Sequence, residues 1–276
     1  MKKRLAALLV ALPLAVAGCS SSGGGDKTPS PSAPTTSPAT SASSPADNGG
    51  GTEPVKGSIT VYAASSLTAA FNTIKTRFEK LYPGTSVTFS FGASSDLATQ
   101  ITQGAPADVF ASAAPVNMKQ IGSNAVGSQD FASNVAEIAV PPKNPAKITK
   151  LADLAKKGVK VAVCAPKVPC GVVAAGVFKN AGLSVKATAF PANVKATLGL
   201  VESGEVDAGI VYVTDVLSAG KKVKGIKVPA NVNVSTEYPI ARLKNAKNTA
   251  VAEAFVQYVQ GTAGQKVLAA DGFRKP

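Results

Sequence analysis

Short apolar runs alternate with amphipathic stretches from Ser58 onward, and this alternation constrains the fold more than any other feature. The run "SITVYAA" at 58–64 has the length and the β-branched residues of a buried strand. Apolar residues then recur every three or four positions from Leu67 to Leu81, which is typical of one face of a helix. The "PG" pair at 83–84 ends that helix.

The same order continues through the rest of the chain. Strands are predicted at 58–64, 85–93, 107–113, 134–142, 159–166, 185–190 and 207–216, with a strand pair around 225–234 and 237–243. Helices are predicted at 67–81, 94–104, 148–158, 171–182, 193–204, 250–261 and 263–273. Strands that alternate with helices indicate an α/β fold with mainly parallel sheets.

The N-terminus has the features of an export signal. Residues 1–18, "MKKRLAALLVALPLAVAG", combine a basic start with an apolar run that is short for a membrane span. The run leads into "VAGC", which resembles the lipobox of bacterial lipoproteins, so Cys19 is expected to become the lipidated first residue of the mature protein. An ordinary signal peptide cut nearby is the alternative. We therefore expect an extracytoplasmic protein anchored to the cell membrane as a lipoprotein.

The segment from the lipidated cysteine to residue 56 has the composition of a tether. Pro, Ser, Thr and Gly dominate it, and it contains almost no residue that could build a core. We therefore interpret residues 19–56 as a disordered connection between the membrane anchor and the folded part.

The charge and the missing histidine narrow the classes of function. The formal net charge is +13, but the lysines are scattered and aromatic residues make up only 5% of the chain. Because export also argues against nucleic acid as a partner, we interpret the excess as a basic surface that mildly favours anions. Histidine is absent, which removes the usual general base and the commonest metal ligand.

Two cysteines remain once Cys19 is assigned to the lipid. Cys164 and Cys170 form a closely spaced pair in an exported chain, and such a pair is expected to be a disulfide. A metal site is the first alternative, but it would need further ligands that the sequence lacks. A redox-active dithiol is the second, and it would usually show a tighter motif.

Small polar residues occur where predicted strands lead into predicted helices. They are Ser65 and Ser66, then Ser94 and Ser95, and later the "PCG" at 169–171. In open α/β sheets such junctions lie at the carboxyl ends of strands, where ligands bind. The first turn of each helix offers unpaired N–H groups and the positive end of a dipole. A single serine there is more often only a helix cap, but several junctions together favour an anion site.

Five segments of the predicted domain carry a family pattern. They are "VYAASSLTAAF" at 61–71, "SFGASSDLATQITQGAPADVFASA" at 90–113, "VPCG" at 168–171, "LGLVESGEVDAGIVYVTD" at 198–215 and "EYPIA" at 237–241. In this order they resemble the periplasmic molybdate-binding proteins of bacterial ABC importers. The resemblance extends from about Ser58 to Phe273, and "GAPADVFASA" and "GIVY" are its more specific parts.

The resemblance implies an α/β fold with two lobes, the periplasmic-binding-protein or Venus-flytrap fold. Each lobe would be a mainly parallel sheet flanked by helices, with strands crossing between the lobes near Val140 and Tyr238. Lobe 1 is expected at 57–139 plus 237–276, and lobe 2 at 140–236. The chain is expected to be monomeric, not to be an enzyme, and to have no cofactor and no metal beyond the bound oxyanion. Its partner would be an ABC importer permease.

The resemblance also implies which residues bind the oxyanion, molybdate or tungstate, in the cleft between the lobes. Ser66 and Ser94 would offer hydroxyl and backbone donors, Cys170 and Val194 backbone N–H groups, and Tyr212 its phenol. Hydrogen bonds to a charged group contribute roughly 1.5–3 kcal/mol each, so these donors could hold a dianion. A site that only donates also disfavours hydrogen phosphate, whose proton would lack an acceptor.

Two positions depart from the family pattern. Cys170 replaces a small residue, which is tolerable if only its N–H is used. Asp96 falls in the first turn of the second predicted helix, where it would repel the anion if it pointed inward, so we expect it to face solvent.

Three other functions stay open from sequence alone. The chain could bind a different tetrahedral oxyanion, sulfate above all. It could be an enzyme on the same fold, although it lacks histidine, a nucleophile motif and suitably paired acids. It could also be a surface adhesion module. The tether would suit that function, but adhesion gives no reason for hydrogen-bond donors at the strand-to-helix junctions.

Overall fold

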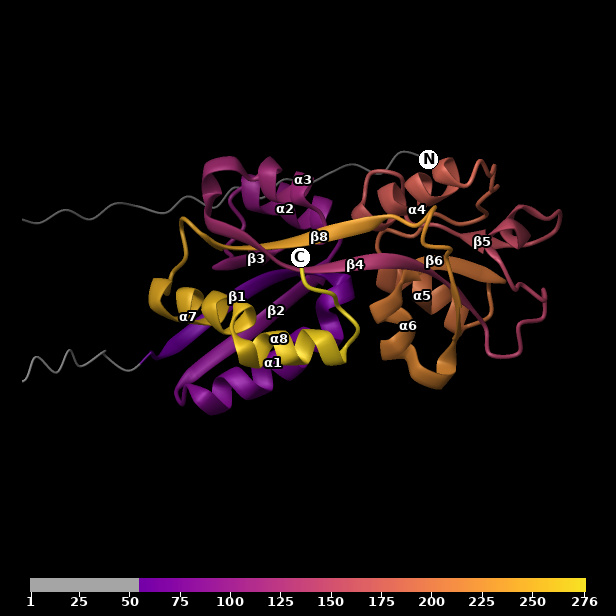
Figure 1. Ribbon diagram of the computed structural model, residues 1–276. Helices are drawn as coiled ribbons and strands as arrows, with labels where there is room; N and C mark the ends of the chain where they lie inside the picture. Colours follow the sequence, from indigo (N-terminus) through magenta and orange to yellow (C-terminus); the bar gives the residue numbers. More distant parts are fainter. Residues whose placement is uncertain (1–54) are drawn as a thin grey trace, which may run out of the picture. The chain divides into compact units, whose positions relative to one another are not determined.

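The computed structural model describes residues 55–276 of the chain, and Figure 1 shows the arrangement of their helices and strands. The predicted leader at 1–18, the lipidation of Cys19 and all but the last two residues of the predicted tether lie outside the described residues. Within residues 55–276, no helix has the length and apolar content needed to cross a membrane.

The described residues form an α/β structure. The strands are β1 Gly57–Ala64, β2 Thr85–Gly92, β3 Val109–Ala111, β4 Ala125–Val140, β5 Val161–Ala162, β6 Ala208–Tyr212, β7 Lys224–Lys227 and β8 Ser235–Leu243. The α-helices are α1 Thr68–Leu81, α2 Ser94–Thr102, α3 Pro115–Gln120, α4 Pro169–Asn180, α5 Val194–Glu202, α6 Val213–Ala219, α7 Thr249–Gln260 and α8 Thr262–Ala270. Short 3-10 helices are η1 Ser65–Leu67, η2 Gly122–Asn124, η3 Leu151–Ala155 and η4 Gly220–Lys222.

The strands are connected in the order β2-β1-β3-β8-β4-β6-β5, and β7 also pairs with β4. Strand β1 is parallel to β2 and β3, and β5 is parallel to β6. The long strands β4 and β8 run antiparallel to each other and to their other partners, and they lie side by side across the middle of Figure 1. A parallel group of strands therefore lies at each end, and two antiparallel strands connect the groups.

Two main hydrophobic cores correspond to these two groups. The first lies among β1, β3, α1 and α7, where the ring of Phe71 packs 6.0 Å from that of Phe255 and the ring of Phe78 packs 5.4 Å from it. The second is mostly aliphatic and gathers side chains of β4, β5, β6, α4 and α5, such as Ile138 and Leu198. Each core lets its group of elements bury an apolar face on its own side of the crossing strands.

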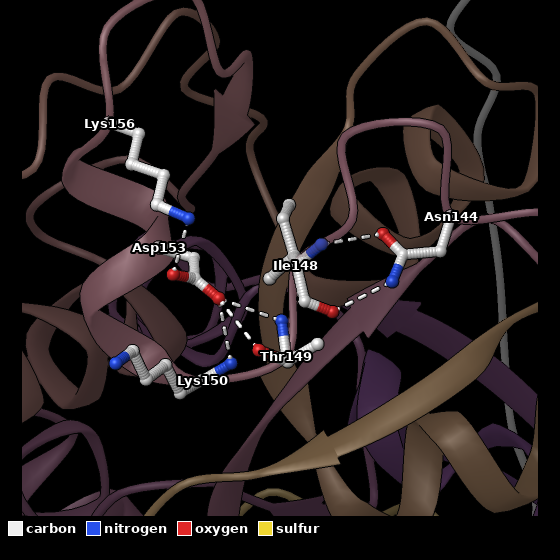
Figure 2. A network of polar contacts seen from close by, with 6 residues as sticks. All are labelled: Asn144, Ile148, Thr149, Lys150, Asp153 and Lys156. Carbon is white, nitrogen blue, oxygen red and sulfur yellow. Dashed lines mark hydrogen bonds and ion pairs between the residues drawn. The ribbon is translucent and has the colours of Figure 1, made fainter.

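The helix predicted at 148–158 is wrong, because only the 3-10 turn η3 forms there. The carboxylate of Asp153 accepts hydrogen bonds from the backbone N–H groups of Thr149 and Lys150, at 2.8 and 3.1 Å, and pairs with the Lys156 ammonium at 2.8 Å. The side chain of Asn144 bonds both the N–H and the carbonyl of Ile148 (Figure 2). These bonds stabilise tight turns in place of a continuous helix.

The strand predicted at 207–216 is half right. Strand β6 ends at Tyr212, and α6 begins with the next residue. The Asp215 carboxylate accepts a hydrogen bond from the backbone N–H of Tyr212 at 3.0 Å. An acidic residue at the third helical position satisfies a free N–H at the helix start, and this local bond competes with further strand pairing.

Other differences concern the extent of strands. The segment 185–190 forms only an isolated bridge, Ala162 with Ala189, so the strand predicted there is wrong. Strand β5 is shorter than predicted, whereas β4 begins nine residues before the predicted start at 134. Helix α3 was not predicted, and β7 pairs with β4 and not with β8.

Candidate functional site

The starts of η1, α2, α4, α5 and α6 surround one small cavity. All five residues predicted to bind the ligand line it: Ser66, Ser94, Cys170, Val194 and Tyr212. The remaining lining residues are also uncharged: Ala64, Ser65, Gly92, Ala93, Ala113, Pro169 and Asn193. The two cores thus contribute facing halves of a cavity whose walls carry no charged side chain among the described residues.

Ser66 reaches the cavity from the first junction. Strand β1 ends at Ala64, and the buried residues of η1 follow directly. The Ser66 hydroxyl lies 2.9 Å from the Tyr238 hydroxyl on β8, and this hydrogen bond connects η1 to one of the two crossing strands. Ser66 is the second residue of η1, and the first N–H groups of a helix have no acceptor within that helix and can bind a ligand.

Ser94 is the first residue of α2 and is buried. Its hydroxyl oxygen accepts a hydrogen bond from the backbone N–H of Ala113 at 2.9 Å, which ties α2 to the segment after β3. Asp96 lies in the same first turn and is exposed, and its carboxylate accepts a hydrogen bond from the Ser95 hydroxyl. The expectation that this acid faces solvent is confirmed.

Cys170 lies in the first turn of α4, and its sulfur is bonded to that of Cys164, as predicted. The disulfide closes the loop that leads from β5 into the helix. At the next position a Cβ would overlap the carbonyl oxygen of Ala165, so only Gly171 allows the loop to pack this tightly against the helix start. The loop geometry therefore directs the helix start, including the N–H of Cys170, toward the cavity.

Val194 opens α5, and Asn193 caps that helix by accepting a hydrogen bond from the N–H of Ala196 at 3.0 Å. Ser94, Cys170 and Val194 lie in the first turns of α2, α4 and α5, where backbone N–H groups have no acceptor within the helix. Unpaired N–H groups at helix starts carry the positive end of the helix dipole, and together they favour an anion.

Tyr212 is fully buried, and its hydroxyl has no hydrogen-bond partner within residues 55–276. Burial raises the pKa of this phenol well above its usual value, and Tyr238 and Asp215 raise it further. The hydroxyl therefore stays protonated at neutral pH and can donate. A buried hydroxyl without a partner is costly, and a ligand oxygen in the cavity would remove that cost.

Asp215 lies close behind this tyrosine and was missed by the sequence analysis as a site residue. Burial raises the pKa of its carboxyl to about 7, although the hydrogen bond from the Tyr212 N–H and the charge of Lys195 both act to lower it. It does not line the cavity. Asp215 follows Tyr212 by three positions in the sequence. At this spacing an acidic side chain often accepts a hydrogen bond from the backbone N–H of the residue that caps a helix start.

The chemistry of the cavity is that of a site that donates hydrogen bonds. Hydroxyls and backbone N–H groups converge on it, and no acidic, basic or histidine side chain that could activate a serine as a nucleophile lines it. The described residues also contain no group of three His, Cys, Asp or Glu side chains that could hold a metal ion. The fold and the cavity together define a binding protein for a small anion, and comparisons with known proteins identify its family.

The chain belongs to the family of bacterial extracellular solute-binding proteins, whose sequence model matches residues 59–274. It is 40% identical over 236 residues to the molybdate-binding protein ModA of Mycobacterium tuberculosis, covering 84% of this chain and 90% of that protein. The sulfate-binding protein of Synechocystis is 26% identical over 270 residues, with coverages of 81% and 77%.

A solved structure shows the same fold. The periplasmic molybdate-binding protein of Azotobacter vinelandii superposes with a TM-score of 0.72 at 23% identity, over 79% of this chain and 99% of that one. The predicted periplasmic-binding-protein fold is therefore confirmed. As a member of a solute-binding family, the chain is not an enzyme.

Proposed function

We propose that this protein captures molybdate in the cavity between its two cores and delivers it to an ABC importer permease. The observation that carries the proposal is the convergence of all five predicted ligand donors on one uncharged cavity. The 40% identity to a protein named for molybdate binding supports the choice of ligand.

The donor set suits a doubly charged oxyanion. Charge-assisted hydrogen bonds contribute roughly 1.5–3 kcal/mol each, so five of them can offset the cost of association and still yield micromolar affinity or better. The walls need no lysine or arginine for this, since the helix starts supply positive partial charge. Tungstate has the same shape and charge, and we propose that it binds equally well.

Sulfate is the alternative ligand, favoured by the similarity to a sulfate-binding protein. It is also a tetrahedral dianion and could use the same donors, but it is smaller than molybdate.

A panel of thermal-unfolding measurements distinguishes molybdate from sulfate. A ligand at about 100 times its Kd adds about 2.7 kcal/mol of stability. At roughly 2–4 °C per kcal/mol, molybdate and tungstate should raise the Tm by about 5–11 °C. Equal or larger shifts with sulfate would overturn the assignment.

The lobes and the anchor complete the proposal. We assign lobe 1 to 57–139 plus 237–276 and lobe 2 to 140–236, with β4 and β8 as the connections. We further propose that the protein is a monomer held at the membrane through a lipid on Cys19, with residues 19–56 as its tether. Mass spectrometry of the exported protein tests the anchor, and an N-terminus without acyl groups on this cysteine would contradict it.

A further inference from the structure

We infer that the end of lobe 2 opposite the cavity binds anionic phospholipid headgroups through a surface of lysines. We call this the distal lysine surface and define it as the six lysines of residues 141–160 together with Lys224. The inference goes beyond capture of the oxyanion. It rests on one part of the proposed function, the lipid anchor on Cys19, which would hold the chain at a membrane.

The register of the strands places these lysines opposite the cavity. Strand β6 ends at the cavity with Tyr212, so its first residue, Ala208, lies at the other end of lobe 2. Strand β5 begins there, because its first residue pairs with Ala208, and the antiparallel β4 ends beside it. Lys224, the first residue of β7, pairs with the last residue of β4. The connection from β4 to β5, residues 141–160, therefore lies at the same end (Figure 1).

The lysines of this surface are all exposed, and little acidic charge opposes them. Asp153 is the one acidic residue of 141–160, and it is buried. Its carboxylate already accepts two backbone N–H groups and pairs with the Lys156 ammonium at 2.8 Å, as Figure 2 shows. The adjacent Asp207 accepts a hydrogen bond from the backbone N–H of Lys160 at 2.8 Å. The surface therefore keeps a clear excess of positive charge.

The composition of lobe 2 indicates the kind of partner that suits such a surface. Residues 140–236 contain 14 lysines, five acidic residues and no arginine, whereas lobe 1 as assigned above contains ten lysines and arginines and eight acidic residues. Arginine can hold one phosphate through two parallel hydrogen bonds, whereas lysine acts as a flexible point charge. A surface of lysines alone therefore suits an extended array of negative charges better than a single phosphate group.

A membrane is the extended anionic surface that this chain would meet. The lipid proposed on Cys19 would keep the folded part near the headgroups, where several weak attractions act at a high effective concentration. Nucleic acid is a poorer match, because aromatic residues on which bases could stack make up only 5% of the chain. Since the distal lysine surface lies opposite the cavity, contact with headgroups would leave the cavity free to exchange its ligand.

Vesicle sedimentation tests the inference on the mature chain with Cys19→Ser, which cannot be acylated, so that binding reports the lysines and not a lipid. We expect binding at low salt to vesicles of equal parts phosphatidylcholine and phosphatidylglycerol, no binding to phosphatidylcholine alone, and release at about 0.5 M salt. Lys143→Gln, Lys160→Gln and Lys224→Gln combined should weaken binding roughly 10–100-fold, because each lysine near an anionic surface contributes about a factor of five.

The matched control combines Lys80→Gln, Lys119→Gln and Lys266→Gln, which removes three exposed charges from lobe 1 and leaves the same net charge. It should weaken vesicle binding less than about threefold, since these lysines lie outside the distal lysine surface. Unfolding scans show whether each variant is folded. The single substitutions in lobe 2, each expected to weaken binding about fivefold, replace a triple variant that does not fold.

No binding of the parent to the phosphatidylglycerol vesicles at low salt would overturn the inference. Equal losses in the two triple variants would also overturn it, because net charge alone would then explain the binding. The lobe 2 triple variant should bind molybdate as the parent does. A parent that binds no molybdate would contradict the proposed ligand, and an exported protein without acyl groups on Cys19 would contradict the anchor, but neither result changes the outcome of the sedimentation.

Discussion

The hydroxyl oxygen of Ser94 lies 2.9 Å from the backbone nitrogen of Ala113 and accepts its proton. This bond connects the start of α2 to the chain after β3, and it leaves the serine proton for the cavity. In the function proposed above, this relationship gives Ser94 a role in binding the anion beyond that of a helix cap. It also predicts that the hydroxyl, and not merely the helix start, matters for binding.

Ser94→Ala and Ser66→Ala should each weaken molybdate binding by roughly 10–100-fold, because each removes one hydrogen bond to a charged group. Calorimetric titration measures the change. Ser95→Ala is the matched control, since the Ser95 hydroxyl donates to the exposed Asp96 and does not line the cavity. It should bind as the parent does. If both cavity variants also bind like the parent, the serines are only caps.

Tyr212→Phe should weaken binding less than either serine variant, by roughly tenfold or a little less. The ring still closes the cavity, and only the unpartnered hydroxyl is lost. In the absence of ligand the variant should be as stable as the parent or more stable, because a buried hydroxyl without a partner is removed. Thermal unfolding with and without molybdate checks both the weaker binding and the ligand-free stability. A large loss of stability in the ligand-free variant would contradict the account.

Replacing Cys164 and Cys170 together by serine should lower stability more than affinity. The disulfide closes a loop with a sequence separation of 6. A loop this short is expected to contribute about 2 kcal/mol through chain entropy. At roughly 2–4 °C per kcal/mol the Tm should therefore fall by about 4–8 °C. Molybdate affinity should drop by less than about tenfold, since the N–H at position 170 is retained. A complete loss of binding in a folded variant would mean that the loop, and not the donor alone, makes the site.

Asp215 should make stability depend on pH. Its pKa is raised to about 7 in the folded protein, against about 3.9 in an unfolded chain. Between these values the folded state binds more protons than the unfolded state, so the contribution of this group to stability falls as pH rises. Asp215→Asn keeps an acceptor for the Tyr212 N–H and removes the titration. Its unfolding free energy should decline less than that of the parent between about pH 4 and pH 7. Identical slopes would show that this carboxyl does not titrate in that range.

The residues that line the cavity could be predicted from sequence because each belongs to a short local pattern. A serine or a proline–cysteine pair at a strand-to-helix junction is visible within a few residues, and the family resemblance selected Val194 and Tyr212 among similar positions. Strands and helices with strong periodicity, such as α1 and α7, were predicted for the same reason.

The residues behind the cavity could not be predicted in this way. Tyr238 meets Ser66 across 172 positions of sequence, and Asn134 meets Thr214 across 80. These contacts arise only when β4 and β8 cross between the two cores, which no local pattern specifies. Helix α6 was misread because "VYVTDV" has the composition of a strand, while the bond from Tyr212 to Asp215 starts a helix there.

Direct calorimetric titration of the purified protein with molybdate, with sulfate as competitor, tests the central claim. The account predicts one molybdate per chain bound with micromolar affinity or better, and little displacement by a large excess of sulfate. Stoichiometric sulfate binding that molybdate fails to displace, or no heat with either anion, would contradict it.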